Sequence, residues 1–240
     1  MVMRIYSKDQ GPRGALDYAF DFLIVVAGVF LGLQAQTWAE HRGDRAQEAR
    51  FLDRLDTEFA ALADEAQRCL TLYEEVGAAA GAVRRALEAY RENGDAPQPE
   101  AFEAVLIRLT AGTLPPGRSA AYLEMVSASE LDLIREAALR EALVRYDETA
   151  TANREHWRTL REQAAPAFNT LYAHIDLTRG ETPGQAEIAA VRLDALSADP
   201  QTATVVTLAV AQATNAYALC SVQAERISAV RARFGEDAAR

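Results

Sequence analysis

Residues that could carry catalytic or metal chemistry are few in this chain and lie far apart. The three histidines, His41, His156 and His174, are scattered, so the sequence contains no zinc-ligand spacing and no Ser/His/Asp or Cys/His arrangement. The glycine-rich nucleotide motifs and the H-E-x-x-H motif are missing as well. The sequence therefore predicts a non-enzymatic protein with no metal site and no cofactor.

One carboxylate, Asp21, directly precedes the most apolar stretch of the chain. Asp21, Gly28, Gly32 and Ala35 recur at helical spacings, so they share one face of a helix. The two glycines allow membrane helices to approach closely, and carboxylates inside a membrane usually face protein or water. We favour an interfacial Asp21 at the helix N-terminus, which stabilises negative charge, over a proton-binding carboxylate or a partner's counter-charge.

The two cysteines, Cys69 and Cys220, fall on the expected buried seams of two different helices. The favoured interpretation is that both are small buried hydrophobic residues. In an oxidising periplasm they could instead form a disulfide between the first and last helices, if their Cα atoms come within about 7 Å. A confirmed disulfide would also indicate the side of the membrane on which the domain lies.

The element that positions Asp21 is a helix formed by the uncharged run Phe22–Ala39, which reads FLIVVAGVFLGLQAQTWA. Its roughly 18 residues are near the lower limit for a helix that crosses a bilayer. A cleaved signal peptide is disfavoured because the apolar core is long, a clean cleavage site does not follow, and Trp38 suits a membrane–water interface. A buried core helix is the other alternative. We expect a transmembrane anchor.

A long helix is expected after the anchor, because apolar residues recur there at spacings of three and four, as in coiled coils. No proline interrupts residues 15–92, and Asn93–Pro97 is a strong stop signal. The predicted fold class is all-α, with an N-terminal transmembrane helix continuing into a long helix of an antiparallel helical bundle. The expected seam is Leu52, Leu55, Phe59, Leu62, Ala66, Cys69, Tyr73, Val76, Ala80, Val83, Leu87 and Tyr90.

Short helices are expected at about 100–110 and 119–126. Ser127 and Glu130 have capping-box spacing and predict the start of a long helix, which Pro166 should kink or divide. Another short helix is expected at about 185–196.

The final helix is expected over 201–233, with Asp199 as its N-cap and Pro200 at its first position. Its residues Gln201–Gln223 are uncharged, but their many polar side chains favour a buried bundle helix over a second membrane span. The expected seam of this helix is Val206, Val210, Ala213, Tyr217, Cys220, Ala224 and Ile227.

These elements predict four regions along the 240 residues. They are a short basic cytoplasmic tail (1–16), the transmembrane anchor (17–39), the helical-bundle domain (40–234) and a disordered tail (235–240). Arginines flank the anchor on both sides, so the positive-inside rule gives no clear orientation. A short basic tail left in the cytoplasm is the simpler insertion, and we expect the domain in the periplasm of a bacterial inner membrane. The formal charge of −10 opposes nucleic-acid binding.

Two stretches together resemble a family of uncharacterised bacterial membrane-anchored proteins. The first runs from Asp21 to Gln34 (DFLIVVAGVFLGLQ) and on to Glu40, and the second from Tyr122 to Arg135 (YLEMVSASELDLIR). Where that family has a Ser-Gly step, this chain has Ala128-Ser129, so a turn that needs a positive φ is in question there. The resemblance implies an N-terminal anchor and an extracytoplasmic helical domain, and it implies no activity.

The leading functional hypothesis is a membrane-anchored protein that self-associates, or that serves as a subunit or scaffold of a membrane complex. Its partners would be the lipid bilayer and a second copy or another membrane protein, and not nucleic acid. Two alternatives remain. One is a periplasmic ligand-sensing bundle, because helices can enclose a small molecule. The other is a proton-coupled accessory subunit that uses Asp21.

Overall fold

The computed structural model describes the backbone of residues 15–179 and 186–237 and the side chains of residues 22–178 and 187–234. The expected cytoplasmic tail therefore lies almost entirely outside the described residues, as do the side chains of the expected C-terminal tail. The chain divides into two compact units, Met1–Arg50 and Phe51–Arg240.

The first helix, α1, extends over Ala15–Asn93 without interruption, and residues from both units belong to it. Its uninterrupted hydrogen bonding agrees with the lack of proline between residues 15 and 92. The helix ends where the stop signal predicts, and Gly94 follows with φ at 76°. This left-handed conformation is favoured by glycine and is common just after a helix end.

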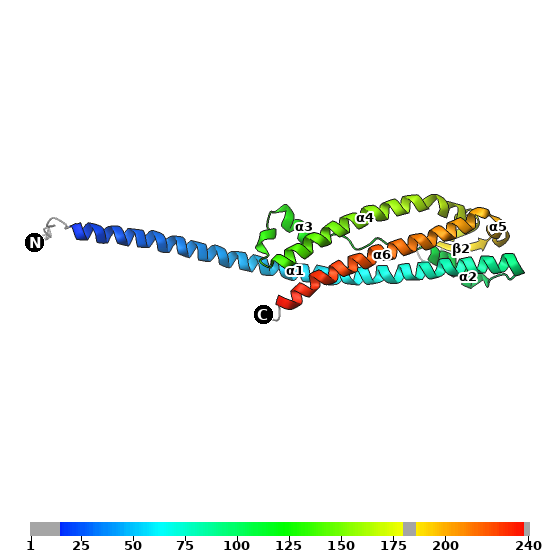
Figure 1. Ribbon diagram of the computed structural model, residues 1–240, viewed down its shortest axis with the longest axis horizontal. Coiled ribbons are helices and arrows are strands. Elements are labelled where there is room, and N and C mark those ends of the chain that lie inside the picture. The colour runs from blue at the N-terminus through cyan, green and yellow to red at the C-terminus, as the bar shows by residue number, and fades with distance from the viewer. Residues whose placement is uncertain (1–14, 180–185, 238–240) are drawn as a thin grey trace, which may run out of the picture. The chain divides into compact units, whose positions relative to one another are not determined.

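The second unit holds the remaining elements, which confirm the all-α prediction (Figure 1). The only sheet among the described residues is the antiparallel pair β1 and β2, with Ile175 opposite Val191 and an irregularity between Asp176 and Leu177. The elements are α2 (Pro99–Leu109), α3 (Ala120–Ser127), a 3₁₀ turn η1 (Leu131–Leu133), α4 (Ala137–Tyr172), β1 (Ile175–Arg179), β2 (Ala186–Val191), α5 (Leu193–Ala198) and α6 (Pro200–Asp237).

Three long helices form the body of this unit: the part of α1 after Arg50, α4 and α6 (Figure 1). The segment 110–119 has no helix and returns along the bundle to α3, so α4 begins at the same end as this part of α1 and runs parallel to it. The last helix, α6, then runs antiparallel to both. Buried residues of all three helices meet in each of the main apolar clusters.

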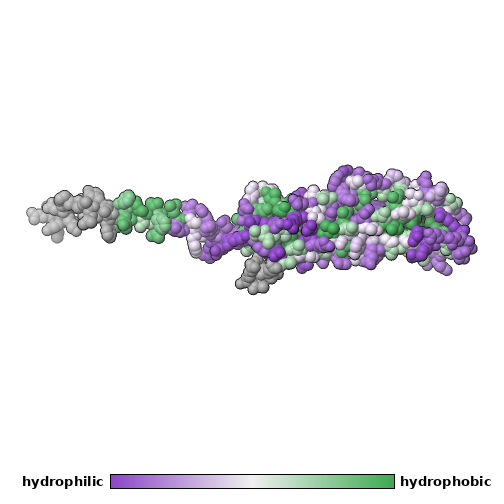
Figure 2. All heavy atoms as spheres, viewed as in Figure 1, coloured by the Kyte–Doolittle hydropathy of each residue, from purple (hydrophilic) through white to green (hydrophobic). Residues whose placement is uncertain are grey.

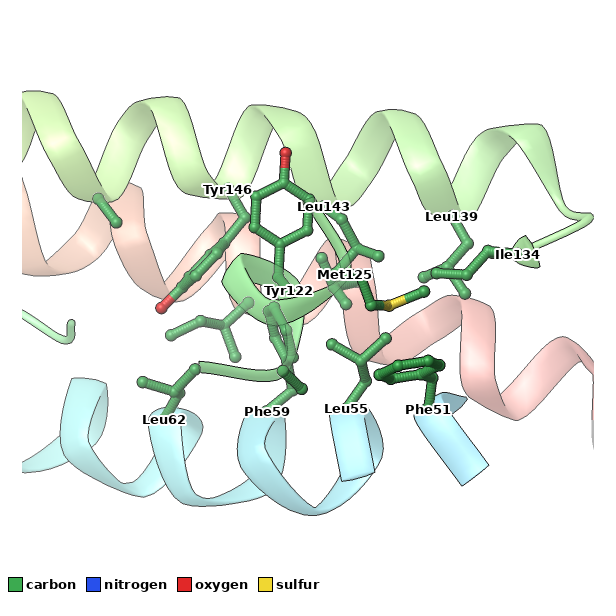
Figure 3. Close-up of a cluster of buried hydrophobic side chains, with 14 of the residues drawn as sticks. Phe51, Leu55, Phe59, Leu62, Tyr122, Met125, Ile134, Leu139, Leu143 and Tyr146 are labelled. Atoms are coloured by element: carbon green, nitrogen blue, oxygen red, sulfur yellow. The ribbon is translucent and has the colours of Figure 1, made fainter. Parts of the chain in front are cut away.

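The largest cluster lies at the end of the bundle that carries α3. Figure 3 shows Leu55 and Phe59 of α1 pointing towards Leu143 and Tyr146 of α4, with Met125 of α3 packed among them. The rings of Phe59 and Tyr146 meet edge to face at 4.8 Å. Almost all of the apolar row expected along α1 is buried, and only Leu52 and Tyr90 are partly exposed. The 3–4 spacing therefore predicted the inner face of α1 correctly.

The start of α4 differs from the sequence-based prediction. Ser127 ends α3 instead of capping α4, and its hydroxyl donates to the Glu124 carbonyl at 2.8 Å. Ser129 adopts φ of 60°, the left-handed conformation that the resemblance assigned to glycine. The 3₁₀ turn η1 follows, so α4 begins only at Ala137. The Ser127–Glu130 capping box was a wrong prediction because the chain turns there before the helix starts.

Two further predictions can be compared with the structure. Of the two effects expected of Pro166, a kink or a division, the division is excluded, because α4 continues from Ala137 to Tyr172 with Pro166 inside it. The helix expected at about 185–196 is instead the strand β2 followed by the short helix α5. Val191 and Ile188 of β2 pack against the apolar cluster at this end of the bundle, so tertiary contacts determine the local structure.

The start of α6 agrees with its prediction. Pro200 is the first helical residue, and the Asp199 carboxylate accepts a hydrogen bond from the Gln201 backbone N–H at 2.8 Å. The other carboxylate oxygen of Asp199 lies 2.9 Å from the His174 ring. Asp199 therefore caps α6 and connects it to the residue that precedes β1.

Candidate functional site: two uncharged helix faces and a bundle cavity

The first candidate surface is the apolar part of α1 in the first unit, from Phe22 to Trp38. None of this stretch is buried, and Phe22 and Trp38 are 71% and 65% exposed. Figure 2 shows this part of α1 as a green, apolar band next to the grey N-terminal residues. The length and composition of this segment are sufficient for a membrane span. An apolar surface of this extent is typical of a lipid or protein contact.

The glycines of this segment present open surface. A Cβ atom added to Gly28 or Gly32 would meet nothing within 4 Å, and Ala35 is exposed. All three belong to α1, so the shared face predicted from their spacing exists in the helix. Asp21 is also part of this helix, but its side chain lies outside the described residues.

The polar residues that follow the apolar band bond within their own helix. The Thr37 hydroxyl donates to the Leu33 carbonyl at 2.9 Å, and the Gln36 amide donates to Glu40 at 2.9 Å. The Arg42 guanidinium lies over the Trp38 ring at 5.5 Å. An aromatic ring next to a cation fits a membrane–water interface, where one end of the residue is apolar and the other is hydrated.

The second candidate surface belongs to α6, which also passes a length and composition test for a membrane span. One third of its most apolar window is buried inside the bundle. Val206, Ala213, Cys220 and Ile227 lie on the buried face, as predicted. Val210 and Tyr217 were expected on that face but are 38% and 42% exposed, so the true seam is rotated towards Ala209 and Ala216.

The opposite face of α6 is exposed and carries no charge over its first six turns. We call it the outer face of α6 and define it by Thr204, Thr207, Ala211, Thr214, Ala218 and Val222. These residues recur at spacings of three and four, so they form a second seam of mostly small side chains. The hydroxyls of Thr207 and Thr214 donate to Ala203 and Val210 carbonyls of the same helix at 2.9 Å. Those hydroxyls therefore need no other hydrogen-bond partner.

The cysteines of α1 and α6 meet in the middle of the bundle. The structure joins Cys69 and Cys220 by a disulfide, with their Cα atoms 6.0 Å apart and a sequence separation of 151. Both residues are fully buried beside Tyr73 and Trp157. The favoured prediction, two small buried residues, agrees with their burial. The alternative prediction, a disulfide between the first and last helices, agrees with the bond between them.

A cavity of about 400 Å³ lies beside this disulfide, inside the second unit. Its walls come from α1, α4, α6 and the segment 110–114 that follows α2. Tyr73 holds this segment in place, because its hydroxyl donates to the Thr113 carbonyl and accepts from the Thr113 backbone N–H at 2.9 Å. Burial raises the pKa of Tyr73 to about 12, so the hydroxyl stays protonated at physiological pH.

The cavity wall combines aromatic rings with a few polar groups. Its aromatic residues are Tyr73, Trp157, Phe168 and Tyr172, and the first two rings meet edge to face at 5.4 Å. Among the lining residues, all of which are described, Arg161 carries the only formal charge. This site was not predicted from the sequence, because its residues come from distant segments of the chain and those on α1, α4 and α6 fit an ordinary helix pattern.

The predicted chemistry-bearing residues remain apart. Among the described residues, no group of three His, Cys, Asp or Glu side chains could hold a metal ion. His156 is exposed on α4, and His41 lies in the first unit. His174 contacts the capping carboxylate Asp199, so its contact is structural.

Comparisons of the chain with family models, with curated proteins and with solved structures found no match.

Proposed function

We propose that this protein is a single-pass, membrane-anchored helical bundle that acts without catalysis, by association of its own copies. The exposed apolar stretch Phe22–Trp38 is the proposed membrane segment. The observation that carries the proposed association is the outer face of α6, which is exposed, uncharged and lined by mostly small residues.

Charge favours a second copy as the occupant of this face. The chain has a formal charge of −10, so two copies repel each other over most of their surfaces. The stretch from Gln201 to Gln223 contains no Asp, Glu, Lys, Arg or His that would oppose contact. Small residues at heptad spacing let two helix backbones approach closely, and exposed Val222 on this face and Leu208 at its margin add apolar area.

Membrane anchoring would strengthen such an association. Two copies confined to one bilayer meet at a much higher effective concentration than two copies in solution. We propose that the basic tail stays in the cytoplasm and that the bundle lies in the periplasm of a bacterial inner membrane. The Cys69–Cys220 disulfide supports this orientation, because disulfides persist in an oxidising compartment such as the periplasm.

The test measures the mass of the full chain in bilayer discs and in a mild detergent. Ala211→Glu with Ala218→Glu places like charges on the outer face and should shift the protein to monomer. Ala152→Glu, on the exposed side of α4, is the matched control and should leave the oligomer intact. A wild-type monomer, or an oligomer unaffected by the double substitution, would overturn the proposal. Loss of the oligomer on Gly28→Leu with Gly32→Leu alone would assign the contact to the anchor.

A second candidate function is ligand sensing, and the cavity is the specific observation that favours it. Pockets of a few hundred Å³ with mostly apolar walls and a few polar groups are the usual form of small-molecule sites. This cavity has about that volume, and its walls combine aromatic and aliphatic side chains with a comparable share of polar groups. Ligand binding to the folded bundle should raise its unfolding temperature, since a ligand that binds only the native state stabilises it.

A further inference from the structure

We infer that the bundle cavity binds a small monoanion with a flat apolar body, such as an aromatic carboxylate. The inference rests on the second candidate function, ligand binding, and it is independent of the proposed self-association. It follows from the shape of the wall, the single charge in it and the polar groups that lack protein partners.

The wall provided by α4 suits a flat apolar body. Trp157, Arg161, Ala164, Phe168 and Tyr172 recur at spacings of three and four, so they follow one face of the helix. Two small residues, Ala164 and Ala165, lie between the larger side chains and leave space there. Aromatic rings that surround such a space favour a planar partner through stacked or edge-to-face contact.

The charge of the wall favours an anion. Arg161 is exposed to solvent as well as lining the cavity, so it lies on the solvent side of the space. Its acidic neighbours on α4, Glu155 and Glu162, bond Arg158 instead, at 2.5 and 2.9 Å. Arg161 forms no ion pair with any carboxylate in the described part of the chain. A guanidinium without a carboxylate partner can bond both oxygens of a ligand carboxylate.

Polar groups in the wall remain available for the same ligand. The side-chain amides of Asn169 and Gln212 make no hydrogen bond to any described residue. The Trp157 indole N–H has no hydrogen-bond partner within the described residues either, but it is sealed from the cavity space, so the two amides are the groups that a ligand could reach. One charged donor and a few neutral polar groups fit a single anionic head better than a polyanion.

The segment 110–114 indicates that the cavity is formed before a ligand arrives. The two hydrogen bonds between Tyr73 and Thr113 fix its backbone, and Gly112 lies directly over the aromatic wall. A Cβ atom added to Gly112 would lie 3.6 Å from the Tyr73 hydroxyl and 3.9 Å from the Trp157 ring. These are ordinary contact distances for a Cβ atom, and a longer side chain at this position would crowd the aromatic wall and take up space that a ligand needs.

The test is calorimetric titration of the full chain in discs of neutral lipid with 1-naphthoate. We expect saturable binding of one molecule per chain, and much weaker binding of the uncharged 1-naphthamide. Arg161→Gln should weaken binding of the naphthoate by about tenfold or more, since it removes a charged hydrogen-bond donor, and should leave the amide unaffected. Arg226→Gln, on the exposed side of α6 and outside the cavity wall, is the matched control and should bind as the wild type does.

Gly112→Leu provides the second variant, because it fills the cavity and keeps every charge. It should abolish binding of the naphthoate with an unchanged unfolding temperature. Equal binding of naphthoate and naphthamide, or binding unaffected by both Arg161→Gln and Gly112→Leu, would overturn the inference, as would a wild-type chain that binds neither compound. The oligomer mass, measured on the same samples, reports separately on the proposed function.

Discussion

Two uncharged stretches of similar length have opposite environments in this molecule. Phe22–Ala39 of α1 is entirely exposed, whereas a third of the most apolar window of α6 is buried in the bundle. Both pass the same length and composition test for a membrane span. The difference lies in where each helix carries its large side chains and its polar groups.

The apolar part of α1 has large aliphatic and aromatic residues on every side, with glycines on one face only. A helix that is apolar all round is stable in lipid or in a core, but not in water. By contrast, α6 has a buried apolar face and an exposed side on which threonine, alanine and asparagine are mixed with a few larger residues (Leu208, Val210, Tyr217 and Val222). The distribution of apolar and polar residues around each helix therefore distinguishes the two stretches, whereas their mean composition does not.

The largest expected effect would show which stretch holds the chain in a membrane. Val26→Arg with Phe30→Arg should release the full-length protein into the alkaline-carbonate supernatant, because each arginine near the centre of a span costs about 2.5–3.5 kcal/mol. Thr204→Arg, on the outer face of α6, with Leu208→Arg at the margin of that face, should leave the protein in the pellet. If instead the α6 variant were released and the α1 variant stayed in the pellet, α6 would be the membrane span.

The next effect concerns the covalent link between the α6 stretch and α1. Cys69→Ala with Cys220→Ala should lower the free energy of unfolding by about 2–5 kcal/mol, because the disulfide restricts the unfolded chain. Urea unfolding followed by Trp157 fluorescence measures the change, and reduction of the wild type should reproduce it. Equal stability of the double variant and the oxidised wild type would exclude a stabilising disulfide.

A matched pair of valines compares the two stretches directly. Val206 of α6 is 2% exposed, whereas Val29 of α1 is 59% exposed. Val206→Ala should lower the free energy of unfolding of the bundle by about 2 kcal/mol, through lost burial and a residual cavity. Val29→Ala should leave it unchanged within about 0.5 kcal/mol. Similar losses from both, in the same urea experiment, would contradict the difference in burial.

The smallest effect lies at the start of α6 and depends on pH. Hydrogen bonds from His174 and from the Gln201 backbone lower the pKa of Asp199 below its ordinary value of 3.8. A lowered folded pKa means that this stabilisation is present above pH 3.8 and is lost as the pH falls through the folded value. Asp199→Asn should therefore flatten the loss of stability in acid, whereas Asp64→Asn should not. If the Asp199→Asn variant lost stability in acid as steeply as the wild type does, the Asp199 carboxylate would not provide this stabilisation.

The long periodic elements could be predicted from the sequence. The row from Leu55 to Leu87 identified the inner face of α1, and Asp199-Pro200 identified the start of α6. In both cases the signal is local, because a repeat of three and four or a capping side chain involves neighbours in sequence. The seam predicted for α6 was correct only in part, because small residues occur on both of its faces, and Val210 and Tyr217 were wrongly assigned to the buried one.

The features that depend on distant contacts could not be predicted. Residues 186–191 form a strand because they pair with β1 and pack on the bundle, and their own sequence does not specify this. The cavity combines Tyr73, Gly112, Arg161 and Gln212, which are far apart in the chain. The only signal in the sequence was the recurrence of Trp157, Phe168 and Tyr172 on one face of α4, and aromatic residues at helical spacing are also typical of an ordinary core.

The link between Cys69 and Cys220 has a consequence for how this molecule would be cut. It closes a covalent ring that contains α2, α3, α4, the β hairpin and the beginning of α6. A protease that cleaves once anywhere inside this ring would not release a fragment, and the nicked protein would run as one species without reductant and as two with it. Proteolytic cleavage of an exposed loop inside the ring would therefore leave both fragments of the bundle connected to α1.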